Sequence, residues 1–301
     1  MPKVLYVEKK FRSSSLDLID KINGVIWEYA GQGYSLTLRQ CYYQLVARGI
    51  IPNNQKSYKN VGNLINDARL AGLIDWNSIE DRTRNLQKLS HWSSPEQIIG
   101  ACADQYRRNL WETQDVYLEV WVEKEALSNV VGRVSNELDI PYFCCRGYVS
   151  QSEMWAASRR FIDYQQRGKH VVLLHLGDHD PSGIDMSRDI EERLKMFWVS
   201  EDGFTFKRIA LSMEQIQTYS PPPNPAKTTD SRFISYINQF GEESWELDAL
   251  EPRVIHDLIT SEVDTWVNHQ RMEDVRDRSN DERQAIQNVA DNWDEIYDQY
   301  R

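Results

Sequence analysis

Apolar residues in the first third of the chain recur every three or four positions, which is the period of an amphipathic helix. Within residues 13–30, for example, Leu16, Ile19 and Ile22 follow this spacing. The same pattern predicts helices over residues 13–30, 36–48, 58–71 and 95–112. A short β-rich stretch at 73–79 leads into the basic residues 81–84. Helices followed by a short basic hairpin form the outline of a winged helix.

The pattern changes in the middle third, where short apolar runs alternate with helical segments. Strands are predicted over residues 116–122, 141–146, 170–176 and 206–211, and helices over 125–138, 151–166 and 184–197. Strands that alternate with helices form a parallel sheet with both faces covered. The sequence therefore predicts an α/β fold in this region. A proline-rich loop at 220–227 separates it from a helical, acidic segment over 230–301.

Charge is unevenly distributed along the chain. The formal net charge is −11, which by itself argues against a nucleic-acid partner. Residues 1–114, however, carry 15 basic and 11 acidic side chains, whereas residues 221–301 carry 8 basic and 18 acidic ones. A locally basic face can bind phosphates despite a negative total. The charge pattern therefore leaves nucleic-acid binding by the N-terminal third open.

No apolar run approaches the roughly 18 to 20 residues that a bilayer span requires. The first 15 residues also lack the long apolar stretch of a signal peptide. The four cysteines show no metal-ligand spacing, so we expect them to be free thiols in a reducing compartment. These features predict a cytoplasmic protein that is not embedded in a membrane.

Acidic residues follow two of the predicted strands directly. Glu123 comes after strand 116–122, and Asp178 and Asp180 come after strand 170–176. The carboxyl ends of parallel strands meet at one edge of a sheet, and residues two apart in an extended segment project to the same side. Carboxylate oxygens are ligands that suit Mg²⁺. We therefore expect a Mg²⁺ site made by these three residues. Surface acids at the starts of loops are the alternative.

Two neighbouring residues are weaker candidates for the same site. His179 lies between the two aspartates, and its side chain is expected to point away from them, so it is not predicted as a ligand. Glu153 follows the flexible Gly147 and is expected first as an acid at a helix N-terminus. A ligand of a second metal is the alternative role for Glu153.

These motifs resemble a known family. The combination of VEKEAL (122–127) with GDHDPSG (177–183) resembles the motifs of the Toprim fold found in topoisomerases, primases and related nucleases. The order VEKEA, RGYVS, GDHDPSGIDM resembles more specifically the A subunit of topoisomerase VI and its relatives that make meiotic double-strand breaks. The resemblance covers roughly residues 35–260. It extends to short stand-alone bacterial and phage members of the family.

The resemblance implies a tyrosine nucleophile. The segment TLRQCYYQLVARG (37–49) is similar to the family's Arg-x-x-Tyr-Tyr motif. By that match Tyr43 is the nucleophile, Tyr42 is its neighbour, and Arg39 contacts the tyrosine or the phosphate. A tyrosine phenol has an ordinary pKa near 10, so it requires a nearby cation or base. Core packing of two tyrosines on an amphipathic helix is the alternative.

The resemblance also implies a domain plan. It gives a tyrosine-bearing winged-helix domain at 1–112, a Toprim domain at 113–260 and an acidic helical extension at 261–301. Candidate phosphate contacts are Arg69, Arg82 and Arg84 in the winged helix, where ordinary surface arginines are the alternative, and Lys124 beside the catalytic Glu123. The segment ELDALEP (246–252) looks like the end of the family's Toprim region and is expected to pack rather than react.

The function implied is Mg²⁺-dependent cleavage, and rejoining, of double-stranded DNA by tyrosine transesterification. A homodimer is expected, because the family combines the tyrosine of one subunit with the metal of another. The sequence has no Gly-x-x-x-x-Gly-Lys-Ser/Thr loop, so strand passage would require a separate ATPase subunit. Two alternatives remain open: a hydrolytic Toprim nuclease in which Tyr43 is structural, and a non-catalytic DNA-binding subunit. The complete acidic triad argues against the last.

Overall fold

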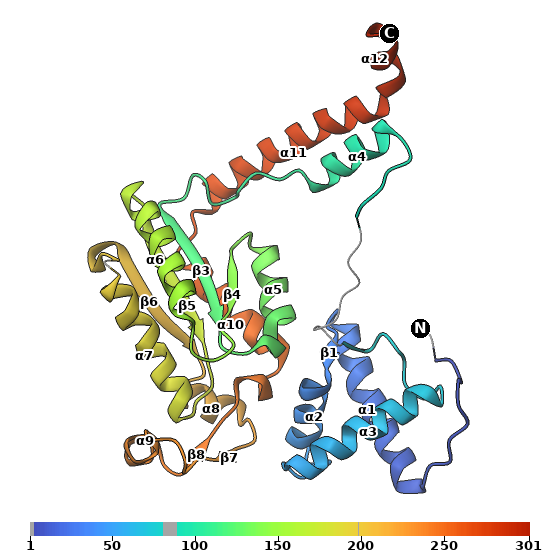
Figure 1. The fold of residues 1–301 in the computed structure, drawn as a ribbon, viewed down its shortest axis with the longest axis vertical. Helices are drawn as coiled ribbons and strands as arrows, with labels where there is room; N and C mark the ends of the chain where they lie inside the picture. The colour runs from blue at the N-terminus through green and yellow to red at the C-terminus, as the bar shows by residue number, and fades with distance from the viewer. Residues whose placement is uncertain (1–2, 81–88, 198) are drawn as a thin grey trace.

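The computed structural model describes residues 3–80, 89–197 and 199–301. It shows an N-terminal group of helices, a parallel sheet covered by helices on both faces, and a helical arm that carries the C-terminus (Figure 1). The α/β fold with a parallel sheet that the alternating pattern predicts is therefore confirmed.

The N-terminal part contains the helices that the apolar period predicts. They are α1 (Ser13–Gly31), α2 (Leu38–Ala47) and α3 (Gln55–Leu70). The second helix begins two residues later than expected, because Leu36–Thr37 form the short strand β1, which pairs in parallel with β2 (Ile79–Glu80). Thr37 then caps α2, since its side chain accepts a hydrogen bond from the backbone of Gln40. The basic hairpin expected after β2 lies outside the described residues, and so do Arg82 and Arg84.

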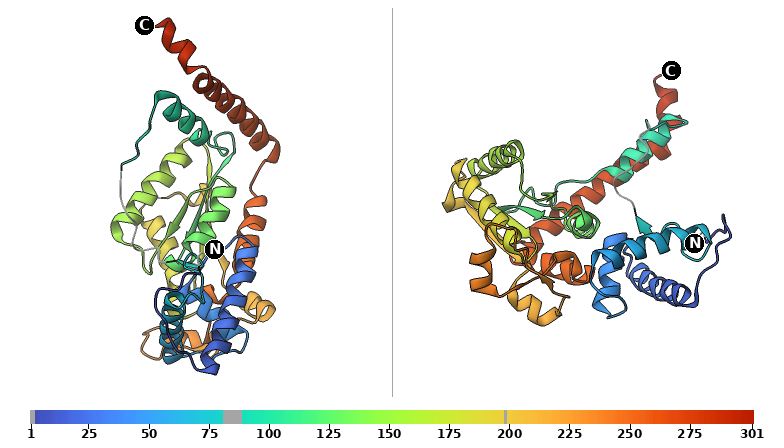
Figure 2. Two further views of the ribbon diagram at one scale, coloured as in Figure 1. Left: turned by 90° about the vertical axis from the view of Figure 1, so that its right-hand side faces the viewer. Right: turned by 60° about the horizontal axis from the view of Figure 1, so that its bottom comes forward.

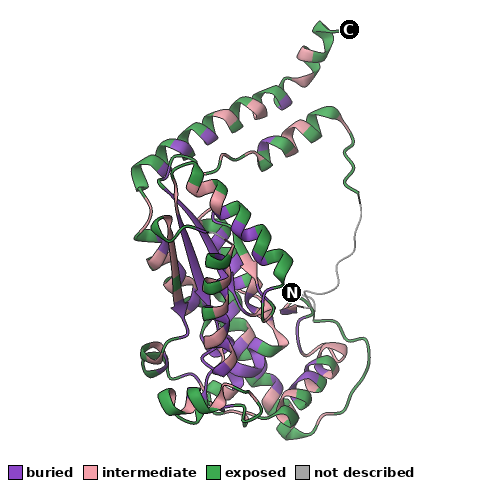
Figure 3. Cartoon of the chain, turned by 60° about the vertical axis from the view of Figure 1, so that its left-hand side comes forward, coloured by how far each residue is buried: buried purple, intermediate pink, exposed green. Residues whose placement is uncertain are grey.

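Four parallel strands form the central sheet, in the order β4-β3-β5-β6. They are β3 (Val116–Val122), β4 (Tyr142–Cys144), β5 (His170–Leu176) and β6 (Phe204–Ala210). The two central strands, β3 and β5, are almost entirely buried (Figure 3). This explains their continuous apolar sequence, because both faces of a parallel sheet are covered.

Helices on the two faces of the sheet bury two separate apolar cores. On one face, α5 (Ser128–Glu137) and α10 (Pro252–Asp264) pack against Leu118, Val120 and Leu174. On the other face, α6 (Gln151–Gln166) and α7 (Pro181–Met196) pack against Trp121 and Leu173. The helix expected over 184–197 starts earlier, at Pro181, because Asp180 provides its N-cap.

The segment between β6 and α10 contains only short elements. These are α8 (Met213–Tyr219), β7 (Asn224–Pro225), α9 (Phe233–Phe240), β8 (Glu243–Ser244) and a 3₁₀ turn, η3 (Leu247–Ala249). β7 and β8 pair antiparallel. This segment brings residues 244–250 to the carboxyl ends of the sheet strands, where the residues around the 3₁₀ turn are mostly buried.

The arm consists of α4 (Pro95–Gln105) packed along α11 (His269–Asp291), followed by α12 (Trp293–Gln299) (Figures 1 and 2). The helix expected over 95–112 is wrong beyond Gln105. After that residue the backbone N–H of Arg108 donates to Ser279 Oγ on α11 instead of continuing the helix. Arg108 Nη1 also donates to Glu282 at 2.8 Å.

In the part of the chain that the structure describes, no helix is both long and apolar enough to cross a bilayer. The four cysteines are free thiols: Cys41 and Cys145 are buried, Cys144 is half-buried and Cys102 is exposed.

Candidate metal centre and tyrosine cavity

The three acidic residues expected to bind a metal lie at the same edge of the sheet. Glu123 follows β3 directly, and its Oε2 accepts a hydrogen bond from the backbone N–H of Asp178 at 2.9 Å. Asp180 lies at the start of α7, where its Oδ1 accepts from the backbone N–H of Gly183 at 2.6 Å. Glu123 and Asp178 are thus direct neighbours, whereas one oxygen of Asp180 serves as a helix cap.

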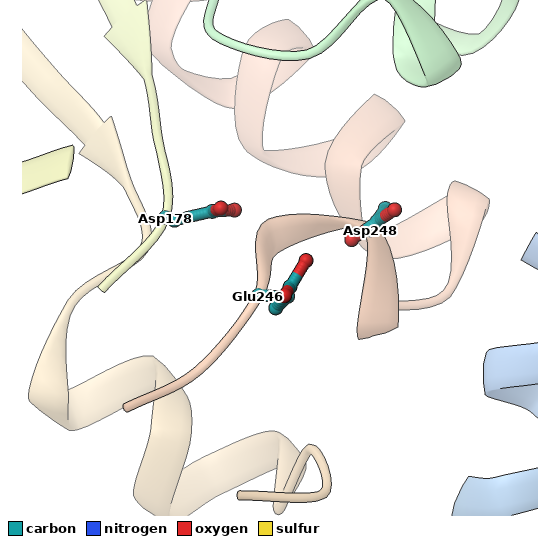
Figure 4. Close-up of side chains that lie close together, drawn as sticks. All are labelled: Asp178, Glu246 and Asp248. Atoms are coloured by element: carbon teal, nitrogen blue, oxygen red, sulfur yellow. The ribbon is translucent and has the colours of Figure 1, made fainter. Parts of the chain in front are cut away.

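A tighter carboxylate cluster forms around Asp178. The side chains of Asp178, Glu246 and Asp248 point toward one another, and each offers one oxygen within 4.8 Å of the others (Figure 4). Asp178 Oδ1 also accepts a hydrogen bond from the backbone N–H of Leu247 at 2.8 Å. We call these three residues the acidic cluster. Glu246 and Asp248 were not predicted as site residues, because the sequence 246–252 was expected only to pack.

A sequence signal for the two missed acids does exist. Glu246 and Asp248 repeat the two-residue spacing of Asp178 and Asp180, and apolar residues surround them. The expected packing is also present, since Leu247 and its neighbours are buried in the core below the sheet edge. The segment therefore both packs and places two carboxylates at the edge.

A backbone bridge holds the two acidic segments together. His179 and Trp245 exchange two backbone hydrogen bonds, at 2.8 and 2.9 Å. The ring of His179 is buried, and its Nδ1 lies 2.8 Å from the hydroxyl of Tyr236. Burial lowers the pKa of His179 to about 4. This side chain therefore serves to dock residues 236–245, as a neutral ring, next to the acidic cluster.

Lys124 lies in the middle of the acidic cluster. Its Nζ is 2.8 Å from Asp178 Oδ2 and 2.9 Å from Asp248 Oδ1, and it also contacts Glu246 Oε2. Burial disfavours the charged ammonium, but the three carboxylates outweigh burial and hold the pKa of Lys124 above its ordinary value. The predicted role of Lys124 as a phosphate contact stays a prediction, because its ammonium points at carboxylates here.

The carboxylates respond differently to this environment. Burial raises the pKa of Asp178 and of Glu123 above the ordinary values, and Lys124 offsets only part of this effect. Burial acts on Glu246 as well, but Lys124 and Arg39 together lower its pKa. Protons therefore compete with cations mainly at Asp178 and Glu123.

Arg208, on β6, supports the loop that carries the aspartates. Its Nη2 donates to the backbone oxygens of Gly177 at 2.9 Å and Asp178 at 2.6 Å. Its Nη1 donates to Gly183 O at 3.0 Å and to Ser187 Oγ at 2.6 Å. A Cβ at position 177 would lie 3.0 Å from this guanidinium, so a larger residue there would have to displace Arg208 slightly. Arg208 was not predicted as a site residue.

The two adjacent tyrosines of α2 have different surroundings. The hydroxyl of Tyr42 is bonded to Asn53 Oδ1 at 3.0 Å and accepts from the backbone N–H of Asn54 at 2.8 Å, so Tyr42 anchors the loop after α2. Tyr43 is 6% exposed, and the guanidinium carbon of Arg39 lies 5.7 Å from its ring centre. Burial raises the pKa of Tyr43 to about 12, and the nearby carboxylates of the acidic cluster add to this effect.

Arg39 joins the tyrosine helix to the acidic cluster of the same chain. Its Nη2 lies 2.7 Å from Glu246 Oε2, and its Nε lies 3.0 Å from Asp248 Oδ2. A cavity of about 470 Å³ lies at this junction, and Arg39, Tyr43, Asp180 and Glu246 are among its lining residues. One chain thus brings the tyrosine and the acids together. A homodimer that shares them between subunits stays a prediction.

Two of the remaining predicted residues have local partners. Arg69 donates from Nη2 to Trp76 O at 2.9 Å and to Ile79 O at 2.5 Å, and it lies over the ring of Trp76. These contacts hold the chain that leads into β2. Glu153 lies exposed in the first turn of α6, where Ser150 caps its backbone N–H at 3.2 Å. This is the helix N-terminal position expected for it.

The acidic cluster fits a hard divalent cation. Mg²⁺ binds oxygen at about 2.1 Å, so two ligands on opposite sides of one ion lie about 4.2 Å apart. Neighbouring ligands at right angles lie about 3.0 Å apart, so the cluster's ligand oxygens, which lie within 4.8 Å of one another, would draw closer around an ion. The donors are all carboxylate oxygens, which favours Mg²⁺ or Mn²⁺ over softer metals.

The sequence matches no model of a known protein family, and it matches no curated protein.

Proposed function

We propose that this protein is a Mg²⁺-dependent enzyme that cleaves double-stranded DNA, with Tyr43 as its nucleophile. The observation that supports this most directly is the cavity that Tyr43 shares with Arg39, Asp180 and Glu246. A nucleophile, a cation and carboxylates around one opening are the parts that phosphoryl transfer requires.

In this proposal the acidic cluster holds the metal. Asp178, Glu246 and Asp248 supply its oxygens, and Glu123 keeps the loop of Asp178 in place through its backbone hydrogen bond. The cation would neutralise the carboxylates and polarise a phosphate oxygen. Arg208 fixes the same loop from below through the carbonyls of Gly177 and Asp178.

The chemical step is a transesterification. The phenol of Tyr43 gives up its proton and its oxygen forms a bond to phosphorus. The bond from phosphorus to one sugar oxygen breaks, and that oxygen takes up a proton, so no net proton is gained or lost. The phosphotyrosyl ester keeps the energy of the broken bond, so the strand can be resealed without ATP. Arg39 lies beside the ring of Tyr43 and supplies the positive charge that favours the phenolate.

A hydrolytic nuclease is the second candidate, and one observation favours it. The pKa of Tyr43 is raised to about 12, which disfavours the phenolate at neutral pH. In this alternative water attacks the phosphate and Tyr43 only lines the cavity. The winged-helix and Toprim assignments are compatible with either reaction, and we propose them for residues 1–112 and 113–260. A separate ATPase subunit would be needed for strand passage, not for cleavage, and a homodimer stays a prediction.

Cleavage of supercoiled plasmid with Mg²⁺ distinguishes these candidates. The reactions are stopped with detergent and divided into protease-treated and untreated halves. Wild type is compared with Tyr43→Phe and Asp178→Ala, and Tyr219→Phe serves as a control tyrosine because it is exposed on α8. Protein attached to DNA ends, lost in the first two variants and kept in the control, is the expected result.

Two other results would change the proposal. Unattached ends that Tyr43→Phe makes as well as wild type, but Asp178→Ala does not, would establish the hydrolytic nuclease. No cleavage by any variant, together with duplex binding in a gel-shift assay, would instead support a non-catalytic DNA-binding role.

A further inference from the structure

Two side-chain cations from distant parts of the chain share the acidic cluster. Lys124, which follows β3, contacts one oxygen each of Asp178, Glu246 and Asp248. Arg39, on the tyrosine helix α2, contacts the latter two. The side chain of Lys124 is only 15% exposed, whereas that of Arg39 is 46% exposed. Each of the three carboxylates is therefore already paired with a positively charged side chain.

The carboxylates that contact these cations are also the ones that could hold a metal. Oδ1 of Asp248 is 2.9 Å from Lys124 Nζ, and its Oδ2 is 3.0 Å from Arg39 Nε. The second contact is not aligned as a hydrogen bond, so charge alone holds that oxygen. Oε2 of Glu246 contacts both cations. A divalent ion within about 2.1 Å of these oxygens would occupy the place of the Lys124 ammonium.

We propose that Lys124 and Arg39 pair with the acidic cluster when no metal is bound. A divalent cation then displaces both side chains, and the displaced side chains bind the DNA phosphate. The proposal rests on the proposed function and adds a regulation of the same site. The charges support an exchange. Three carboxylates with two monovalent side chains leave one negative charge, and one divalent ion in their place leaves the same charge.

One of the two cations already lies at the cavity where the phosphate would bind. Arg39 already lines the cavity beside Tyr43. Lys227 lines the same cavity, 71% exposed and 3.7 Å from Asp180. Guanidinium and ammonium groups bind phosphate well only when carboxylates do not already neutralise them. DNA should therefore bind this cavity tightly only after the metal.

Equilibrium binding of Mn²⁺, followed by the electron paramagnetic resonance of the unbound ion, tests the exchange. Lys124→Met and Arg39→Gln each remove one internal competitor, so each should bind Mn²⁺ about fivefold more tightly or better. Lys169→Met and Arg48→Met serve as controls, since Lys169 contacts the carbonyl of Trp111 and Arg48 pairs with Glu28 away from the cluster. The controls should bind like wild type.

The variants differ in their risk of misfolding. Lys124→Met leaves three carboxylates close together, and circular dichroism shows whether it folds. Arg39→Gln changes a half-exposed side chain and keeps the test valid if the first variant does not fold. Unchanged or weaker Mn²⁺ binding by folded Arg39→Gln would overturn the exchange, even if wild type binds Mn²⁺ and cleaves DNA.

Salt dependence of duplex binding tests the second half of the proposal. It is measured with and without Mg²⁺ in Tyr43→Phe protein, so that no covalent product forms. The slope of log affinity against log salt measures how many cationic side chains contact phosphates. With Mg²⁺ present, two displaced cations should make this slope steeper by about 1.8 than that of the Lys124→Met/Arg39→Gln double variant in the same buffer. Equal slopes would refute the transfer to DNA. If neither wild type nor any variant binds Mn²⁺, the acidic cluster is not a metal site, and the proposed exchange is refuted as well.

Discussion

Arg208 Nη2 lies 2.6 Å from the backbone oxygen of Asp178, so a half-buried arginine on β6 fixes the loop that presents an acid of the cluster. This contact couples two neighbouring strands of the sheet at the edge where the carboxylates gather. Burial lowers the pKa of Arg208 below its ordinary value, although the carboxylates of Glu123 and Asp178 act in the opposite direction.

The first prediction concerns Arg208 as a positioning residue. Arg208→Met removes one hydrogen-bond donor from each of the carbonyls of Gly177, Asp178 and Gly183. We therefore expect a loss of about 1–3 kcal/mol in unfolding free energy. Mn²⁺ affinity should fall by about 10- to 100-fold, and Arg208→Lys should restore part of it. Arg160→Met, which removes the arginine that pairs with the buried Glu119, is the matched control. An equal loss of Mn²⁺ affinity in the control would contradict a positioning role.

The second prediction concerns the acids that only the structure revealed. If the acidic cluster holds Mg²⁺, saturating MgCl₂ should stabilise the protein by about 2.7 kcal/mol at 100 times the dissociation constant. The rise in melting temperature should be absent in Glu246→Gln and Asp248→Asn. It should remain in Glu243→Gln, because Glu243 is exposed three residues earlier. If MgCl₂ raises the melting temperature of the first two variants as much as that of wild type, the metal site lies elsewhere.

The third prediction concerns pH and His175. This ring is fully buried on β5, with Nδ1 2.9 Å from Ser187 Oγ. Burial, and then the charge of Arg208, lower its pKa to about 3. The unfolded chain takes up a proton below about pH 6.5, whereas the folded chain does not. Stability that His175 contributes above pH 6.5 is therefore lost as the pH falls from 6.5 toward 3.

Urea unfolding at several pH values measures this effect. Between pH 7.5 and pH 5, wild type should lose about 2 kcal/mol more than His175→Phe does. His269→Gln, which changes an exposed histidine, should follow wild type. If the unfolding free energies of wild type and His175→Phe change with pH in the same way, the prediction is wrong, because the buried ring would then take up a proton without destabilising the folded chain.

The fourth prediction separates a site within one chain from a site shared by two. Tyr43 and the acidic cluster lie together in a single chain here, joined by Arg39. If this arrangement is the reactive one, a mixture of Tyr43→Phe and Asp178→Ala proteins should not cleave plasmid. A shared site would instead rebuild one intact centre per mixed dimer. Single-strand nicks from the mixture, absent for each variant alone, would establish the shared site.

Local patterns were sufficient to predict the sheet and the acids that end its central strands. The runs at 116–122 and 170–176 are continuous and apolar because both faces of β3 and β5 are buried, and that burial appears directly in the sequence. The positions of Glu123 and Asp178 followed from the strands. The end of α4 did not, because Arg108 turns to a partner on α11 that lies 171 residues away.

The sequence by itself determined the sheet strands, most of the helices and the two acids at the strand ends, since periodicity and caps act over a few residues. Only the tertiary structure decided what surrounds them. The bridge between His179 and Trp245 brings Glu246 and Asp248 to Asp178, and the contact of Arg39 with Glu246 spans 207 residues. Such pairings depend on how whole elements pack, because charges and backbone groups that are far apart in sequence become neighbours only after the chain has folded.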